Sequence, residues 1–313
     1  MTAAGRVCPL RYRYGAAAIA NAEPTGAATL YVVGGLYGNR AALDALAALV
    51  AAEPGPVRIC FNGDFHWFDA RADDFAAVDR WVAGHDATLG NVEAELLADE
   101  ASAGCGCAYP EDVDDATVAR SNRIHARLKQ TARGDDDAIA HLARLPMVRR
   151  YRIAEIDIGV VHGDADSLAG WRFGLPAIDV ADTHEWRHNA FQLAGVRVFA
   201  SSHTCLPVLR CFGAGRGRIA VINNGAAGMP NFSDRREGLV SRLSSSPPPL
   251  PSLYGTRIGA LYLDALPLRY DHDRWLSQFL RCWPAGSAAH ESYYRRILRG
   301  PAHEPSLAAT RHG

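Results

Sequence analysis

Several short apolar segments of this chain stop at a small residue next to a polar one, and this feature constrains the fold more than any other. The segment 57–61 leads into Gly63-Asp64, and the segment 156–161 leads into His162. Such segments are typical of strands in an α/β sheet when helical stretches lie between them. Ligand-binding groups of α/β sheets lie beyond the carboxyl ends of the strands. The sequence therefore predicts an α/β fold with a functional site at these turns.

Hydrophobic periodicity predicts helices and strands in alternation in the first half of the chain and mostly strands in the second. Strands are predicted at residues 28–34, 57–61, 149–153, 156–161, 196–200, 208–212, 219–222 and 257–263, with another short strand ending at Gly90. Helices are predicted at residues 39–52, 73–84, 112–133, 135–145, 182–193 and 288–298. We expect one domain over residues 1–301, with a helical insertion at about 99–146, and a disordered tail at 302–313.

The composition narrows the class of protein. The 313 residues carry a formal net charge of -1, so the basic excess that nucleic-acid binding favours is missing. No apolar stretch reaches the roughly 20 residues that cross a bilayer, and the Ala-rich run at 16–22 is too short for a signal peptide. The seven cysteines do not form the disulfide pattern of a small secreted protein. We therefore expect a cytoplasmic protein with reduced thiols and no nucleic-acid or membrane partner; the oligomeric state stays open.

Four of the predicted strand ends carry side chains of the kinds that bind metal ions. Each lies next to a glycine or another small residue, which lets the backbone turn sharply and direct the side chain outward. They are Asp64, Asn91, His162 and His203. A carboxylate, an amide oxygen and two imidazoles suit a borderline divalent ion such as Mn²⁺, Fe²⁺ or Zn²⁺. A single histidine at a strand end is more often structural, so the prediction depends on all four together.

Six turns follow one another in a fixed order along the chain. They read Gly35-Leu36-Tyr37-Gly38-Asn39, Gly63-Asp64, Gly90-Asn91-Val92-Glu93, His162-Gly163, Ser202-His203-Thr204-Cys205 and Asn223-Asn224-Gly225-Ala226. Over about residues 30–232 this order resembles the calcineurin-like metallophosphoesterases, whose turns read D-x-H-G-N, G-D, G-N-H-E or G-N-H-D, H-G, G-H-T-H and N-x-G-S. The resemblance implies a four-layer α/β/β/α sandwich of two mixed sheets with outer helices, and a metal site along one edge.

The resemblance implies one bound cation where the family holds two. In the family, the aspartate and histidine of the first turn and the last histidine of the fifth bind the first metal. This chain has Gly35, Tyr37 and Cys205 at those positions. The ligands of the second metal all match, at Asp64, Asn91, His162 and His203. We therefore expect one tightly bound divalent ion, Mn, Fe or Zn, with the thiolate of Cys205 as a further ligand.

These matches imply a hydrolase in which a metal-activated water attacks a small-molecule phosphate mono- or diester. Besides Asp64 and Asn91, the expected catalytic residue is His66, because Val92 replaces the family's histidine that assists the leaving group. The alternative for His66 is a loop histidine stacked on Trp67. Substrate contacts are expected at Tyr37, Asn39, Trp67 and Asp164. The missing ligands favour a second hypothesis, a catalytically degenerate relative that acts as a ligand-binding or regulatory module.

The zinc-protease motif H-E-x-x-H occurs at residues 184–188. The stretch that follows, NAFQLAG, supplies no third ligand at the extended-motif spacing. We therefore expect an amphipathic surface helix that packs Trp186 and Phe191 inward.

Cys105 and Cys107 flank one glycine in a polar loop. Two thiols fall short of the four ligands of a structural zinc site. We therefore expect a loop with two free thiols, and a soft-metal or redox role stays open.

Overall fold

The computed structural model describes residues 4–98, 103–175, 177–215 and 217–309, and its core consists of two six-stranded sheets. One sheet, here the β2 sheet, has the strand order β11-β12-β10-β2-β3-β4. Its strands span Tyr254–Ile258, Leu261–Leu268, Gly238–Ser244, Thr29–Val33, Val57–Asn62 and Asp86–Thr88. Strands β2, β3 and β4 are parallel, while β10, β11 and β12 pair antiparallel, so the sheet is mixed.

The other sheet, here the β6 sheet, has the strand order β1-β5-β6-β7-β9-β8. Its strands span Pro24–Gly26, Val148–Ile153, Ile156–Val161, Val198–Ser201, Gly217–Asn224 and Pro207–Ala214. The central strands β6, β7 and β9 are parallel. Strands β5 and β8 pair antiparallel with β6 and β9, so this sheet is mixed as well.

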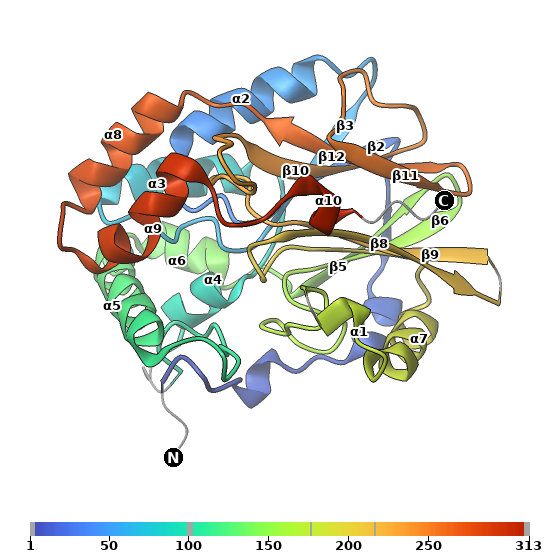
Figure 1. The fold of residues 1–313 in the computed structure, drawn as a ribbon, viewed down its shortest axis with the longest axis horizontal. Helices are drawn as coiled ribbons and strands as arrows, with labels where there is room; N and C mark the ends of the chain where they lie inside the picture. The colour runs from blue at the N-terminus through green and yellow to red at the C-terminus, as the bar shows by residue number, and fades with distance from the viewer. Residues whose placement is uncertain (1–3, 99–102, 176, 216, 310–313) are drawn as a thin grey trace.

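The two sheets face each other across an apolar core (Figure 1). Leu30 and Val32 of β2 belong to the same buried cluster as Ile158 of β6, Val198 of β7 and Ile222 of β9. β-branched and other aliphatic side chains suit a strand with a buried face, and burying each one contributes about 1.5–3 kcal/mol. This shared core fixes the sheets relative to each other, and with them the ends of their strands.

Helices cover the outer faces of both sheets (Figure 1). The β2 sheet packs against α2 (Arg40–Ala51), α3 (Ala72–Ala83), α5 (Asp115–Ala132), α8 (His272–Cys282) and α9 (Ala288–Arg299). The β6 sheet packs against α1 (Ala16–Asn21) and α7 (Thr183–Ala194). Two short helices, α4 (Asn91–Leu96) and α6 (Asp136–Leu142), lie near α5. The predicted four-layer α/β/β/α sandwich of two mixed sheets is confirmed.

Near the C-terminus one strand prediction is wrong, and the structure places a short helix in the predicted tail. The segment 257–263 is not one strand but the turn of the β11–β12 hairpin, where Gly259 adopts φ 60°. The tail predicted to be disordered contains α10 (Pro305–Ala308), whose Ala308 is buried and accepts a hydrogen bond from Arg210 over 2.7 Å. Residues 310–313 of that tail lie outside the described residues, as do residues 99–102 of the predicted insertion.

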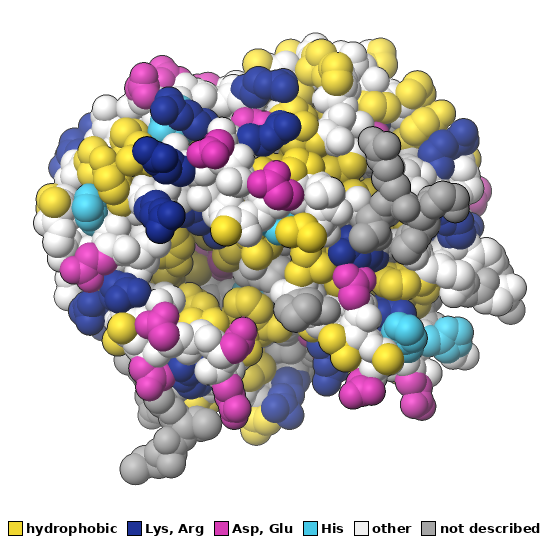
Figure 2. Space-filling model, in the orientation of Figure 1, with side chains coloured by type: hydrophobic (Ala, Val, Ile, Leu, Met, Phe, Trp, Pro, Cys, Tyr) yellow, Lys and Arg dark blue, Asp and Glu magenta, His cyan; other side chains and the backbone are white. Residues whose placement is uncertain are grey.

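The surface carries mixed charge. On the face in Figure 2, acidic and basic side chains are interspersed, and a hollow bordered by hydrophobic side chains lies between them. In the described part of the chain, no helix combines the length and the apolar character that crossing a bilayer requires.

Candidate metal centre

The structure brings the four predicted ligand side chains together at the carboxyl ends of β3, β4, β6 and β7. The Nε2 atom of His162 lies 3.2 Å from Oδ1 of Asp64, 3.1 Å from Oδ1 of Asn91 and 3.2 Å from Nδ1 of His203. Ligand atoms of Asp64, His162 and His203 all lie within 4.8 Å of one another. All four residues are buried, so the polar atoms are gathered where water has little access.

The proton positions of the two imidazoles follow from their outer partners. Nδ1 of His162 lies 2.8 Å from the carbonyl oxygen of Asn62, and Nε2 of His203 lies 3.2 Å from the carbonyl oxygen of Cys107. A carbonyl oxygen only accepts hydrogen bonds, so each of these ring nitrogens carries a proton. The inner nitrogens, Nε2 of His162 and Nδ1 of His203, therefore point lone pairs at each other when the rings are neutral. Histidines that bind metals are usually oriented by such a carbonyl.

The amide of Asn91 is oriented in the same way. Its Nδ2 donates to the carbonyl oxygen of Cys105 over 3.0 Å, so its Oδ1 faces the centre. With the carboxylate of Asp64, four lone-pair atoms then surround one point. Ligands about 2.0–2.2 Å from a tetrahedral or octahedral cation lie roughly 3–3.5 Å from one another, which matches the distances from Nε2 of His162. The residues fit a borderline divalent cation.

The electrostatic environment keeps Asp64 and His203 in the forms that bind metals. Burial raises the pKa of Asp64, but His162 outweighs this and holds that pKa below its usual value. Burial lowers the pKa of His162, but Asp64 reverses the effect and raises it overall. Burial and the neighbouring His162 lower the pKa of His203 to about 3. At neutral pH, Asp64 is therefore ionised and His203 is neutral, as metal binding requires.

Glu93 organises the turns that carry two of the ligands, and the sequence analysis missed it. Its fully buried carboxylate accepts hydrogen bonds from the backbone N–H groups of Asp64 (2.8 Å), Phe65 (3.0 Å), His66 (3.3 Å) and Gly90 (3.1 Å). It thereby supports a left-handed residue, because Asp64 has φ 55°. Glutamate three residues after Gly90, at the start of a helix, is the spacing of a capping box, and this signal could have revealed it.

A small cavity of about 40 Å³ opens beside the ligand cluster. Its walls are Tyr37, Asp64, Trp67, Asn91, Val92, Cys107, Tyr109, Trp171, His203, Cys205 and Tyr293. The predicted substrate contacts Tyr37 and Trp67 are therefore placed at the site. Tyr293 comes from α9, about 90 residues after Cys205 in the chain, and no sequence pattern indicated that it would contribute.

Cys205 lines the cavity but does not belong to the ligand cluster. Its Sγ lies 2.8 Å from the hydroxyl of Tyr37, and both residues have positive φ. Burial raises the pKa of the Cys205 thiol, with Arg296 acting in the opposite direction. The structure therefore does not place Cys205 among the ligand atoms, where the prediction had it bind as a thiolate, and its thiol pairs with a phenol.

His66 lies away from the cavity, contrary to the predicted catalytic role. Its Nδ1 is 2.9 Å from Oδ2 of Asp69, and its ring stacks on Phe75 with centroids 4.0 Å apart. Burial lowers the pKa of His66, but Asp69 and Asp79 raise it to about 9. The left-handed turn at Asp64 directs the side chain two residues later into the protein. The alternative prediction, stacking on Trp67, is also wrong, because the partner is Phe75.

The side chains of Asn39 and Asp164 form hydrogen bonds with backbone groups and do not face the cavity where a substrate would bind. The side chain of Asn39 accepts from the N–H of Ala42 and donates to the carbonyl oxygen of Gly228, which caps α2. The carboxylate of Asp164 accepts from three backbone N–H groups of its own loop, at Asp166, Ser167 and Arg172. Neither residue lines the cavity, so the two predicted substrate contacts are replaced by structural roles.

The N-terminal segment fastens the two loops that cover the site. The N–H of Gly5 donates to the carbonyl oxygen of Ala103, and the carbonyl oxygen of Gly5 accepts from the N–H of Tyr109. The carbonyl oxygen of Tyr12 accepts from the N–H of Leu168. Between these loops, Nε1 of Trp171 donates to the carbonyl oxygen of Cys107 over 3.1 Å. The loop around Cys107 therefore positions His203 and Trp171 through one carbonyl group. The thiols of Cys105 and Cys107 are free, as predicted.

The H-E-x-x-H motif forms part of a surface helix, as predicted. His184 and His188 of α7 are exposed, whereas Phe191 is buried. Trp186 packs on Phe173 with ring centroids 5.6 Å apart. The two histidines therefore do not enclose a metal site.

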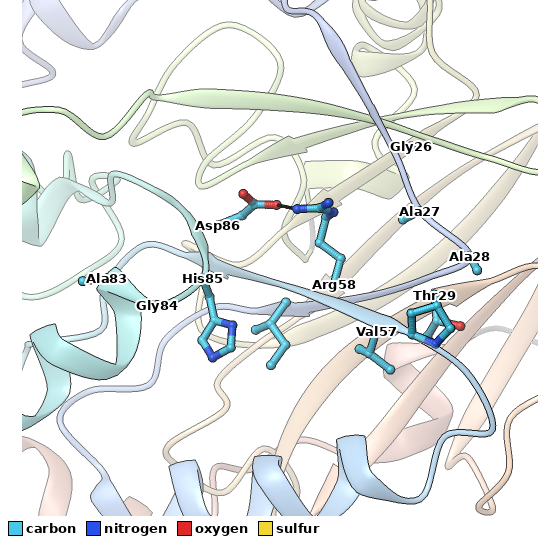
Figure 3. A pocket seen from close by; sticks show the side chains of 12 residues that line it. Gly26, Ala27, Ala28, Thr29, Val57, Arg58, Ala83, Gly84, His85 and Asp86 are labelled. Carbon is cyan, nitrogen blue, oxygen red and sulfur yellow. Dashed lines mark hydrogen bonds and ion pairs between the residues drawn. The ribbon is translucent and has the colours of Figure 1, made fainter.

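A larger cavity, of about 570 Å³, lies at the opposite ends of the strands (Figure 3). Its lining includes Thr29, Val57 and Asp86, the first residues of β2, β3 and β4. The charged groups Arg58 and Asp86 pair with each other over 3.1 Å. The size of this cavity favours it as a binding site, but its chemistry does not, because the charges of Arg58 and Asp86 already balance each other. We therefore assign the functional site to the smaller cavity.

Acidification is expected to destabilise the metal-free chain through His125, which lies behind the site. Its Nε2 donates to the carbonyl oxygen of Val92, and burial lowers the pKa of His125 to about 4 from 6.5. The unfolded chain therefore binds the proton first, and the stability that neutral His125 provides above pH 6.5 is lost as the pH falls toward 4.

The variant His125→Gln keeps a hydrogen-bond donor for the carbonyl oxygen of Val92 but does not titrate. Urea unfolding with a chelator should show the free-energy difference between wild type and variant shrinking by about 2 kcal/mol from pH 7 to pH 5. A constant difference would contradict this assignment.

Comparisons with known proteins agree with the architecture. A crystal structure of a metallophosphoesterase from Sphaerobacter thermophilus matches with a TM-score of 0.53 and 15% sequence identity, over 87% of this chain and 100% of that chain. A hypothetical protein from Pyrococcus horikoshii matches with a TM-score of 0.57 and 15% identity, over 88% and 99% of the two chains. No family model and no curated protein matches the sequence. Similarity at this identity establishes the fold, and the chain has the fold of the calcineurin-like metallophosphoesterases.

Proposed function

We propose that this protein is a metal-dependent phosphoesterase that binds one divalent cation. The ligands would be Asp64, Asn91, His162 and His203. The observation that carries the proposal is the convergence of three lone-pair atoms, from Asp64, Asn91 and His203, on Nε2 of His162 at 3.1–3.2 Å. Backbone carbonyl groups on the outer side orient the two imidazoles and the amide. Buried polar groups without donors are costly unless a cation joins them. A metallophosphoesterase with the same fold supports the proposal.

Tyr37 supports one cation rather than two. A Cβ atom added at Gly35 would lie 2.9–3.0 Å from the ring and hydroxyl of Tyr37, so that ring fills the space a ligand at position 35 would need. The Tyr37 hydroxyl is in turn paired with Cys205. The three positions expected to bind another metal therefore form a closed, uncharged group.

A bound cation would act as a Lewis acid and lower the pKa of a water molecule attached to it. The chain supplies the rest. Asp64 and His203 hold their deprotonated forms at neutral pH, and Trp67, Tyr109 and Trp171 enclose the cavity. Burial raises the pKa of Tyr37 well above its usual value, so its hydroxyl keeps a proton beside the cavity. Tyr37 therefore replaces His66 as the candidate that donates a hydrogen bond to a leaving group.

The rival function, a metal-dependent binding module without turnover, is favoured by Val92. This residue lines the cavity where a histidine would donate a proton in the resembling family, and valine cannot do so. In this reading the cation and aromatic walls hold a small phosphorylated ligand.

Metal analysis and hydrolysis of p-nitrophenyl esters separate the two functions. We expect one equivalent of Mn, Fe or Zn per chain, because the ligand cluster can hold one cation, and metal-dependent release of p-nitrophenol. Removal of the metal with a chelator should stop the release, and its return should restore it. One equivalent of metal without turnover would support the binding module. Two equivalents per chain would contradict the single-cation site.

A further inference from the structure

The cavity beside the ligand cluster has no cationic side chain in its walls. Its eleven described lining residues include one carboxylate, that of Asp64, and no lysine or arginine. The remaining phenol, indole, thiol and aliphatic groups carry no full charge at neutral pH. Arg296 is near but lies behind the wall, where its guanidinium donates to the carbonyl oxygens of Cys205 and Pro230. Recognition of a phosphoryl group therefore depends on the cation alone.

The charge of such a site limits the charge of its ligand. A divalent cation together with the carboxylate of Asp64 leaves a net charge of one positive unit. The other acidic group nearby, Glu93, does not line the cavity, and its carboxylate is turned toward four backbone N–H groups. A phosphodiester, with one negative charge, balances the site, whereas a doubly charged monoester leaves one negative charge in a buried aromatic cavity. Burying an unpaired charge is strongly unfavourable.

The walls suit the organic part of an ester. Trp67, Tyr109, Trp171 and Tyr293 present flat aromatic surfaces, and the ring of Trp171 meets that of His203 edge-on at 5.0 Å. Aromatic walls of this kind pack against planar or apolar groups. From charge and lining together, and resting on the proposed function, we infer that the substrate is a singly charged phosphodiester with a planar or apolar ester group, and not a doubly charged phosphomonoester.

Two esters that differ by one charge test this inference. p-Nitrophenyl phosphate and methyl p-nitrophenyl phosphate release the same product, and a methyl group replaces one negative charge. At pH 8 we expect kcat/KM of the metal-loaded protein to be at least tenfold higher for the methyl ester. Binding gives a readout independent of turnover, because Trp67 and Trp171 lie in the cavity walls. Quenching of tryptophan fluorescence should show dimethyl phosphate binding at least tenfold more tightly than methyl phosphate, and the metal-free protein should bind neither.

Substitution of Trp171 provides the matched control. Trp171→Arg adds the missing positive charge at the half-buried rim and should reduce the preference for dimethyl phosphate at least fivefold. Trp171→Gln has a similar polar reach without the charge and should keep the preference. Equal or tighter binding of methyl phosphate by the wild type would overturn the inference while leaving the phosphoesterase intact. Failure to bind any metal or to hydrolyse either ester would instead overturn the proposed function and, with it, this inference.

Discussion

Replacement of His162 by alanine is expected to remove metal binding and, with it, all metal-dependent ester hydrolysis. Nε2 of this residue is the atom from which the distances to Asp64, Asn91 and His203 are all 3.1–3.2 Å. Its loss therefore removes the central ligand and leaves the carboxylate of Asp64 without its main counter-charge. Substitutions of outer partners alone reduce metal affinity about 10–100-fold, so loss of the ligand should exceed 100-fold. Isothermal titration with Zn²⁺ or Mn²⁺ measures it.

His184→Ala is the matched control for this prediction. His184 belongs to the other histidine motif of the chain but is exposed on α7, so its removal should leave metal content and turnover unchanged. Thermal unfolding of both variants without metal checks that each still folds. Metal binding that survives in His162→Ala would contradict the ligand assignment. Metal binding that is lost in His184→Ala would place the cation at the surface helix.

The sequence predicted the convergence of the four ligands because topology alone brings them together. Parallel strands end at one edge of a sheet, so Asp64 and Asn91, which follow β3 and β4, must lie near each other. The same reasoning holds for His162 and His203 after β6 and β7. The positions of these residues follow from strand order, which a pattern of apolar segments and turns can indicate.

Side-chain direction within a turn could not be predicted in this way. Spacing placed His66 near Asp64, but the φ of 55° at Asp64 sends the two side chains apart. Asn39 and Asp164 also follow strand ends, but their side chains accept hydrogen bonds from backbone N–H groups of their own turns. Turn residues are thus predicted to lie near the site, while their role depends on which backbone groups remain to be satisfied.

Elements with weak local signals were also missed. Helix α4 begins at Asn91 itself, so the strand end and the helix start share one short segment. Helix α8 has a strongly amphipathic sequence in which Trp275 and Phe279 are buried among polar residues, and low apolar content hid it. Strand β10 contains the buried Arg242, which pairs with Glu53 and Asp264, and a charged residue in a central strand argues against a strand on sequence grounds. Tertiary partners make these segments stable.

Replacement of Glu93 by glutamine is expected to be the most damaging change outside the ligands. The four backbone N–H groups donate to both carboxylate oxygens of Glu93. A protonated carboxyl group would point its O–H at these donors and find no acceptor among them, so the arrangement requires the ionised form. Burial and the neighbouring Asp64 carboxylate raise the pKa of Glu93, whereas His66, the backbone N–H of Asp64 and His162 favour its ionised form. A glutamine amide must turn its NH₂ group toward one pair of donors. Two charge-assisted hydrogen bonds are then lost, at about 1.5–3 kcal/mol each.

The free energy of unfolding of Glu93→Gln should therefore fall by about 3–6 kcal/mol, measured by urea unfolding without metal. Metal affinity should fall about 10–100-fold, because the turn that presents Asp64 loses its support. Glu291→Gln, at an exposed position in the first turn of α9, is the matched control and should change neither quantity. If Glu93→Gln kept its metal affinity while losing stability, the carboxylate would support the fold without positioning Asp64. The left-handed turn at Asp64 would then be held by β3 and α4 alone.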